Sequence, residues 1–173
     1  MSGKHGGPPR KFLGHSEMRV ELGTRRIIDK RGMAMADIEA LGRRYAEEFW
    51  NEGNLDFADE AFAPDHQYHD PLLPDLPPGP EGVKQRRGIY MSVIGDAKVD
   101  LKDLVASDDA VVLRWSWGGT HTGEFMGQPP TNEAVETTGM HMLKVRDGKI
   151  VETWVEYDSA GFMNQTGVIS LPG

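Results

Sequence analysis

Acidic and aromatic side chains alternate near the C-terminus, in a pattern that could carry acid–base chemistry. The stretch from Val151 to Gly167 reads VETWVEYDSAGFMNQTG. In a strand, successive side chains point to opposite faces, so Trp154 and Asp158 would share one face. A carboxylate enclosed beside an indole ring is partly desolvated, which raises its pKa and suits it to accept a proton next to a carbonyl group. Asp158 is therefore predicted to be a catalytic base.

A hairpin turn at Asp147-Gly148 predicts which residues face this row from the neighbouring strand. Pairing across the turn would place His141 opposite Trp154, on the same face as Asp158. A bulge would shift that register. His141 is the second catalytic candidate, because a histidine there could stabilise developing negative charge by hydrogen bonding.

Other side chains are predicted to bind a substrate. His121 and Arg114 could donate hydrogen bonds to enolate or carbonyl oxygens. Aromatic side chains could form flat apolar walls for a polycyclic ligand: Trp154, Trp117, Phe125 and Tyr68.

Each candidate also has a structural interpretation that the sequence leaves open. Asp158 precedes SAGFMNQ and is suited to cap a helix there, a role compatible with catalysis. His141 could be a core histidine whose hydrogen bonds are made inside the protein. His121 could serve only to hold its loop in place. Arg114 could form an ion pair on the sheet, and the tryptophans could be ordinary core residues.

Histidine and aspartate crowd together in DHQYHD, residues 65–70, as they do in some metal sites. In an extended segment, His66 and His69 point to opposite faces, and no H-x-H or H-E-x-x-H pattern supports chelation. We therefore predict no metal site. The sequence also contains no Walker loop, dinucleotide fingerprint or G-x-S-x-G elbow.

Helices are predicted in the first half of the regular part of the chain. Residues 35–54 carry apolar side chains at three- and four-residue spacing, and Gly53 suits the left-handed end of a helix. A short helix follows at 55–62, closed by Pro64. A proline-rich loop with one short strand at His66–His69 leads to a third helix at 82–95.

From Ala97 onward the pattern has period two and predicts four strands, over residues 97–107, 110–123, 135–146 and 149–158. Helices followed by antiparallel strands predict an α+β fold. A curved sheet wrapped around about three helices would enclose one apolar pocket. The sheet faces would also carry Trp115, Met140, Met142 and Tyr157, an apolar patch that predicts a homodimer.

Length and charge predict one folded domain with an extension. The chain has 173 residues and 38% hydrophobic content, enough for one core. Residues 1–32 have a net charge of +5 and are predicted to be a flexible or dimer-embracing basic extension. Residues 33–173 form the predicted domain, with a net charge of −13. We expect no nucleic-acid partner, because the acidic body repels phosphate and the arm has no reading module.

Targeting signals are not evident in the sequence. No apolar run approaches the length of a membrane span, and the basic start lacks the apolar stretch of a secretory signal. The chain has no cysteine, which excludes disulfides and thiol chemistry. A soluble, cytoplasmic protein with no membrane partner is expected.

Several motifs resemble one family. The loop GTHTGEFMGQPPT (119–131), the W-x-x-x-D pattern of Trp154 and Asp158, and a Gln-x-Gly ending at Gln165 and Gly167 occur in order, and His69-Asp70-Pro71 follows two short helices. From about residue 36 to residue 169 the chain resembles the SnoaL-like polyketide cyclases, also called ester cyclases, of the ketosteroid-isomerase-like (nuclear transport factor 2-like) fold.

The resemblance implies a cone-shaped α+β barrel around an apolar pocket, usually a homodimer, with no metal or organic cofactor. Characterised members close the last ring of an aromatic polyketide by intramolecular aldol condensation, with an aspartate near the C-terminal strand as general acid and base. By motif position that aspartate is Asp158, and the resemblance adds His69 to the substrate-binding candidates.

We therefore expect a cofactor-independent enzyme of the polyketide cyclase type that uses enolate chemistry on a mostly apolar, polycyclic small molecule. Two alternatives stay open. One is a non-catalytic module that binds a small molecule in the same pocket, and the other is a dimeric interaction domain.

Overall fold

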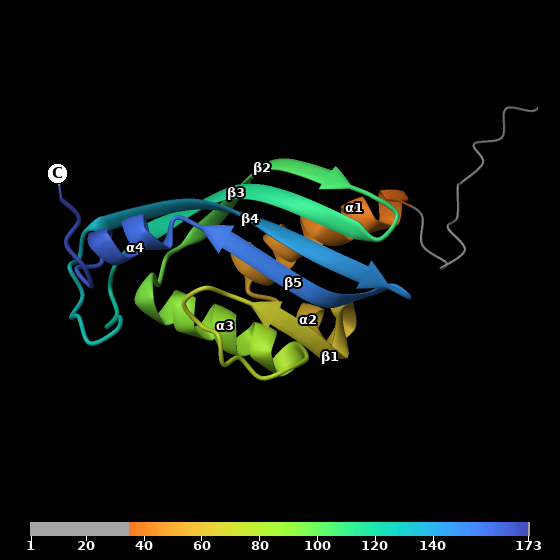
Figure 1. The fold of residues 1–173 in the computed structure, drawn as a ribbon, viewed down its shortest axis with the longest axis horizontal. Coiled ribbons are helices and arrows are strands. Elements are labelled where there is room, and N and C mark those ends of the chain that lie inside the picture. The colour runs from red at the N-terminus through yellow and green to blue at the C-terminus, as the bar shows by residue number, and fades with distance from the viewer. Residues whose placement is uncertain (1–34, 173) are drawn as a thin grey trace, which may run out of the picture.

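The computed structural model describes residues 35–172 and confirms the α+β fold that the sequence predicts (Figure 1). Within these residues, helices pack against a curved sheet of five strands. The basic extension predicted for residues 1–32 lies outside the described residues.

The first helix begins as α1 (Met35–Arg44) and continues directly as the π-helix η1 (Tyr45–Glu52). Its predicted apolar stripe is buried: Ile38, Leu41, Tyr45, Phe49 and Trp50. The wide π-helical turn brings Tyr45 and Trp50, five residues apart, to the same side of the helix. Gly53 ends the helix with φ of 78°, the left-handed conformation predicted for it.

The segment after this helix joins the sheet. The short helix α2 (Asp56–Ala61) leads directly into β1 (Phe62–His69), which is longer than the predicted strand and pairs in parallel with the last strand. Pro64 lies inside β1, where an edge strand tolerates its missing N–H. The third helix, α3 (Pro80–Val93), begins at Pro80, because a proline fits the first helical turn.

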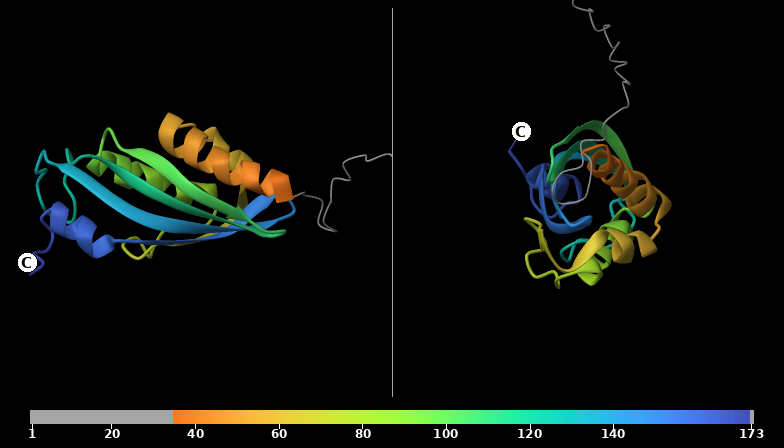
Figure 2. Two further views of the ribbon diagram at one scale, coloured as in Figure 1. Left: turned by 90° about the horizontal axis from the view of Figure 1, so that it is seen from above. Right: turned by 90° about the vertical axis from the view of Figure 1, so that its right-hand side faces the viewer.

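The other strands form the antiparallel part of the sheet. They are β2 (Lys98–Ala106), β3 (Ala110–Thr120), β4 (Ala134–Arg146) and β5 (Lys149–Tyr157), and the sheet order is β1-β5-β4-β3-β2. A last helix, α4 (Ser159–Gln165), contacts β4. Figure 2 shows the sheet curving around the helices, so that its concave side faces α1 and α3.

The β4–β5 hairpin turns where predicted, but a bulge next to the turn shifts its register by one residue. His141 therefore lies opposite Val155, and Trp154 lies opposite Met142. The prediction that His141 and Trp154 face each other is wrong. His141 and Val155 are buried in the core, whereas Trp154 is partly exposed on the outer face of the sheet.

Candidate active site

A narrow, mostly apolar cavity lies between the sheet and the helices η1 and α3. Its volume is about 40 Å³, so a ligand with rings requires the surrounding side chains to move outward. Its aromatic walls come from helices and strands alike: Tyr45, Trp50, Tyr90, Trp115, Trp117, Tyr157 and Phe162. Trp115 and Tyr157 thus point inward, which corrects their predicted place in an exposed patch.

His141 lies in the wall of this cavity, at the end of a buried chain of hydroxyl groups. Its Nε2 is 2.9 Å from the Tyr68 hydroxyl, which is 3.0 Å from the Tyr45 hydroxyl. Donation can run in either direction along this chain. If Tyr68 donates to Nε2, the ring proton is on Nδ1; if Nε2–H donates to Tyr68, Nδ1 carries a lone pair. His141 can therefore present either a donor or an acceptor at Nδ1.

The electrostatic surroundings keep the His141 imidazole neutral. Burial, and then the positive charge of Arg86, hold the pKa of His141 well below its usual range. Its Nδ1 makes no hydrogen bond within residues 35–172. A neutral imidazole with one nitrogen bonded to a hydroxyl and the other unengaged is suited to general acid–base catalysis.

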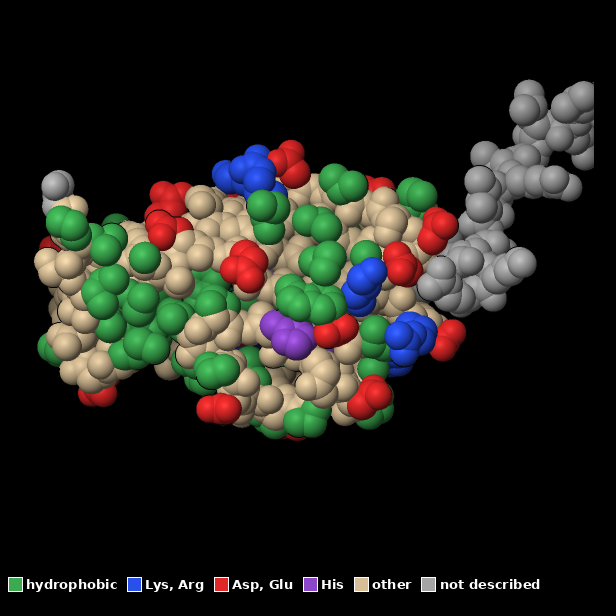
Figure 3. Space-filling model, viewed as in Figure 1, with side chains coloured by type: hydrophobic (Ala, Val, Ile, Leu, Met, Phe, Trp, Pro, Cys, Tyr) green, Lys and Arg blue, Asp and Glu red, His purple; other side chains and the backbone are tan. Residues whose placement is uncertain are grey.

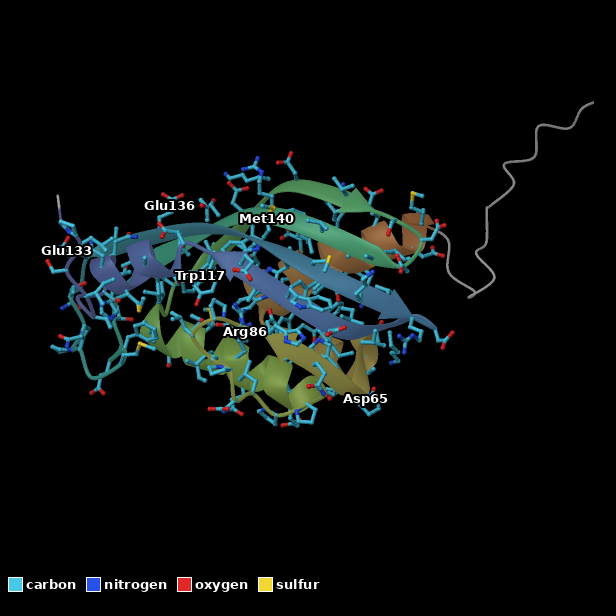
Figure 4. All side chains as sticks on the ribbon, in the orientation of Figure 1. Asp65, Arg86, Trp117, Glu133, Glu136 and Met140 are labelled. Carbon is cyan, nitrogen blue, oxygen red and sulfur yellow. The ribbon has the colours of Figure 1, made fainter. Side chains whose placement is uncertain are left out.

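A buried ion pair stands beside the same cavity. The Arg86 Nε–H donates to Asp70 Oδ2 at 2.7 Å, and the two side chains are 5% and 0% exposed. The backbone N–H groups of Leu72 and Leu73 donate to Asp70 Oδ1 at 2.9 and 3.2 Å. Burial alone would lower the pKa of Arg86, but the neighbouring Tyr68 and Asp70 raise it, so Arg86 stays charged. Figure 4 shows Arg86 between α3 and the sheet.

Phenol and indole groups supply further donors at the cavity. The Tyr90 hydroxyl lies 2.6 Å from that of Tyr157 and donates to Asp70 Oδ1 at 3.2 Å. Burial raises the pKa of Tyr90 to about 12 and also raises that of Tyr157, so both are protonated at neutral pH. Within the described part of the chain, the indole N–H groups of Trp115 and Trp117 are buried without a partner. A ligand oxygen could satisfy them.

Of the predicted site residues, His141 and Trp117 line the cavity, and Tyr68 is hydrogen-bonded to His141. Three others lie on the outer side of the sheet. Trp154 stacks on His69 with ring centroids 5.0 Å apart, and His69 Nε2 is 2.9 Å from Glu152. Arg114 is exposed and pairs with Asp103 at 2.5 Å. The bulge explains the position of Trp154, since the prediction assumed the unshifted register.

The remaining candidates lie at the end of the molecule near α4. Asp158 caps this helix, because its Oδ1 accepts the Gly161 N–H at 2.8 Å, and it is not part of the cavity wall. His121 is buried in its loop, where its Nδ1 accepts the Thr131 backbone N–H at 3.2 Å. Phe125 packs against Phe162, which lines the cavity.

The sequence-based prediction missed Arg86, Asp70, Tyr90 and Tyr157. A signal for Arg86 was present, because it falls in the buried stripe of α3 with Val83, Tyr90 and Val93. A charge in such a stripe requires a partner inside the protein. Asp70 stood in the His69-Asp70-Pro71 motif, but its pairing with Arg86 depends on the tertiary fold.

The part of the chain that the structure describes shows neither a metal-ligand cluster nor a membrane-spanning helix. Among residues 35–172, no group of three or more histidine, aspartate or glutamate side chains is arranged to hold a metal ion. No helix in the same range is long and apolar enough to cross a membrane.

Comparison with known proteins agrees with the fold. Residues 40–166 match the model of the SnoaL-like polyketide cyclase family. No curated protein shows a significant match to the chain.

Several solved structures are similar. TsrD from Streptomyces laurentii is 23% identical with a TM-score of 0.70, covering 79% of this chain and 99% of its own. AclR from Streptomyces galilaeus, a proposed hydroxylase, is 26% identical with a TM-score of 0.69, over 81% and 87% of the two chains. IdmH from Streptomyces antibioticus, a proposed polyketide cyclase, is 33% identical with a TM-score of 0.64, over 74% and 96%.

Proposed function

Because the chain belongs to the SnoaL-like polyketide cyclase family, we propose that it is a cofactor-independent enzyme acting on a mostly apolar, polycyclic small molecule. The proposed reaction is an aldol-type ring closure through an enolate. The enclosed aromatic cavity supports an apolar ligand. The observation that carries the proposal is the neutral, buried His141, with Nε2 bonded to Tyr68 and Nδ1 unengaged.

In the proposed mechanism, His141 moves the proton. Its Nδ1 lone pair takes a proton from the carbon between two carbonyl groups, which leaves an enolate and an imidazolium. The enolate carbon attacks a second carbonyl carbon of the same molecule, forming the new C–C bond and an alkoxide. The imidazolium then returns the proton to the alkoxide. A weakly basic imidazole is sufficient because two carbonyl groups spread the enolate charge.

The hydroxyl chain has a positioning role in this mechanism. For Nδ1 to accept a proton, Nε2–H must donate to Tyr68, and Tyr68 must then donate to Tyr45. This direction also gives the imidazolium a hydrogen-bond acceptor at Nε2. In this proposal, Tyr68 accepts from Nε2–H and so holds the tautomer that the first step needs.

A catalytic role for Asp158 stays a prediction from the strand pattern and the family motif. Its carboxylate is exposed and engaged at the start of α4, so we assign it the capping role in this proposal. Replacing Asp158 distinguishes the two roles.

The experiment that tests the function is ring closure by the purified protein. A panel of aromatic polyketide methyl esters is incubated without added metal or cofactor, and product isomers are separated by chromatography. Closure above the rate in buffer supports the proposal. Binding without closure would favour a non-catalytic binding module, and absence of both would favour an interaction domain.

We also propose that the protein is a homodimer that buries the outer face of the sheet. Apolar side chains lie partly or fully exposed there: Val112, Met140, Met142 and Trp154. Figure 3 shows hydrophobic side chains exposed on this side of the molecule. Burying such a patch stabilises a dimer. Light scattering tests this, and a mass near 19.2 kDa at micromolar concentration would contradict it.

A further inference from the structure

Arg86 brings a positive charge into the lining of an otherwise apolar cavity. The residue is 4% exposed. Its guanidinium carbon lies 4.8 Å from the ring centres of Tyr68 and Tyr90 and 5.2 Å from that of Trp50. These rings and the bond from Nε to Asp70 hold the guanidinium in one place.

Most of the donors of Arg86 are unused. A guanidinium carries five N–H groups, and the Nε–H is the one that Asp70 accepts. Within residues 35–172, Nη1 and Nη2 donate to no acceptor. Nη1 and Nη2 are therefore available to donate to a ligand oxygen, and the Arg86 side chain is already held in place before a ligand binds.

Asp70 leaves much of this positive charge available. Its carboxylate also accepts the backbone N–H groups of Leu72 and Leu73 and the Tyr90 hydroxyl, so its negative charge is shared among several donors. The positive charge of Arg86 also lowers the pKa of His141, and so contributes to keeping its imidazole neutral. Arg86 and His141 thus act on the same enclosed space.

We propose that Arg86 binds an anionic oxygen of the ligand through Nη1 and Nη2, and that the natural ligand is a ring system that carries an enolised 1,3-dicarbonyl group in addition to the carbon from which His141 takes the proton. The inference rests on the proposed function only in taking this cavity as the ligand site. The conjugated oxygens of such a group spread one negative charge, as a carboxylate does, and match the planar edge of a guanidinium. The apolar walls would exclude an anion if Arg86 were not there.

Two naphthoquinones test this without knowledge of the substrate. 2-Hydroxy-1,4-naphthoquinone is a conjugated anion at neutral pH, and 2-methoxy-1,4-naphthoquinone is its uncharged methyl ether. Their affinities can be measured by calorimetry and by quenching of the tryptophans in the cavity wall. The wild-type protein should bind the anion about tenfold or more tightly than the ether, as expected for hydrogen bonds to charged groups.

Variants assign this preference to Arg86. Arg86→Lys should reduce it, because an ammonium lacks the planar pair of donors. Arg86→Met combined with Asp70→Asn leaves no unpaired buried charge, and should reverse the preference in favour of the ether. Arg43→Lys is the matched control, since Arg43 is exposed and pairs with Glu39 on α1, and it should bind both probes as the wild type does. Thermal melts establish that each variant is folded.

The possible results separate this proposal from the proposed function. His141→Gln should keep the preference for the anion, because binding does not need the proton transfer. Two results would overturn the role of Arg86 and leave the proposed function standing. One is a wild-type protein with equal affinity for both probes, and the other is a folded double variant that still prefers the anion. If neither probe bound the wild type, the cavity would not be the ligand site, and both proposals would fail.

Discussion

At the scale of single residues, His141 differs from an ordinary surface histidine by its burial, its neutrality and its hydroxyl partner. Burial lowers its pKa, so protonation does not compete with its use as a base near neutral pH. The Tyr68 hydroxyl at 2.9 Å fixes which ring nitrogen faces the cavity. These features together suit it to accept and return a proton.

Replacing Tyr68 with phenylalanine tests the positioning of His141. The change removes the hydroxyl between Tyr45 and His141 and keeps the ring. We expect kcat to fall by about tenfold with little change in KM, because the loss concerns the tautomer of His141 rather than ligand contact. Tyr45 and His141 lose a buried partner, so the unfolding free energy should fall by about 1–3 kcal/mol. Steady-state kinetics with unchanged kcat in the folded variant would exclude this role.

Replacing Asp158 separates capping from catalysis. Asp158→Asn keeps a capping oxygen for the Gly161 N–H and removes the carboxylate charge. We expect its turnover and melting temperature to stay close to wild type. Asp158→Ala should lower the unfolding free energy by about 1 kcal/mol, as for other N-cap losses. A folded Asp158→Asn protein without turnover would instead support the prediction that Asp158 is the base.

Some site residues could be predicted from sequence, and others could not. His141, Trp117 and Tyr68 were identified by residue type and by the strand pattern. Trp154 was placed on the wrong face, because the two-residue turn fixes pairing only up to the first bulge. The pairing of Arg86 with Asp70 joins α3 to the end of β1, a contact that local patterns do not specify.

At the scale of elements, close packing between β4, β5 and β3 shapes the cavity wall. Gly139 on β4 lies where a Cβ atom would come within 2.6 Å of the Glu156 carbonyl oxygen and 2.7 Å of the Trp115 ring. The absence of a side chain there lets Trp115 pack against the sheet beside His141. Periodicity predicted these strands well, but it could not show this contact between them.

Replacing Gly139 with alanine tests this packing. The added methyl group would push against backbone that has no space to move, so we expect the unfolding free energy to fall by about 1–3 kcal/mol. Gly88→Ala is the matched control, because nothing lies within 4 Å of a Cβ at that position in α3. An alanine there should stabilise the helix by about 0.5–1 kcal/mol. Denaturant unfolding of both proteins measures this, and equal effects would contradict it.

At the scale of the whole molecule, buried histidines couple stability to pH. His66 is 1% exposed, and its Nε2 lies 2.9 Å from the hydroxyl of Thr153. This contact links β1 to β5. Burial, with a smaller contribution from His69, lowers the pKa of His66 to about 4. The unfolded chain therefore binds a proton more readily than the folded protein between about pH 6.5 and pH 4.

We expect the unfolding free energy to be constant above about pH 7 and to fall as the pH drops from 6.5 toward 4. The shift in the pKa of His66 corresponds to a loss of about 3 kcal/mol. His141 adds to this loss, because its pKa is also lowered. Urea unfolding across this range measures the effect, and His66→Gln should flatten the curve. A wild-type curve that is flat down to pH 4.5 would show that His66 is not buried in its neutral form.

The central claim is that His141 transfers the proton in ring closure, and His141→Gln tests it most directly. Glutamine keeps a polar side chain beside Tyr68 but cannot accept and return the proton. Turnover of an aromatic polyketide methyl ester should fall by about a hundred- to ten-thousandfold relative to wild type, while the variant stays folded and still binds 2-methoxy-1,4-naphthoquinone. A folded His141→Gln protein that closes the ring at the wild-type rate would contradict the claim.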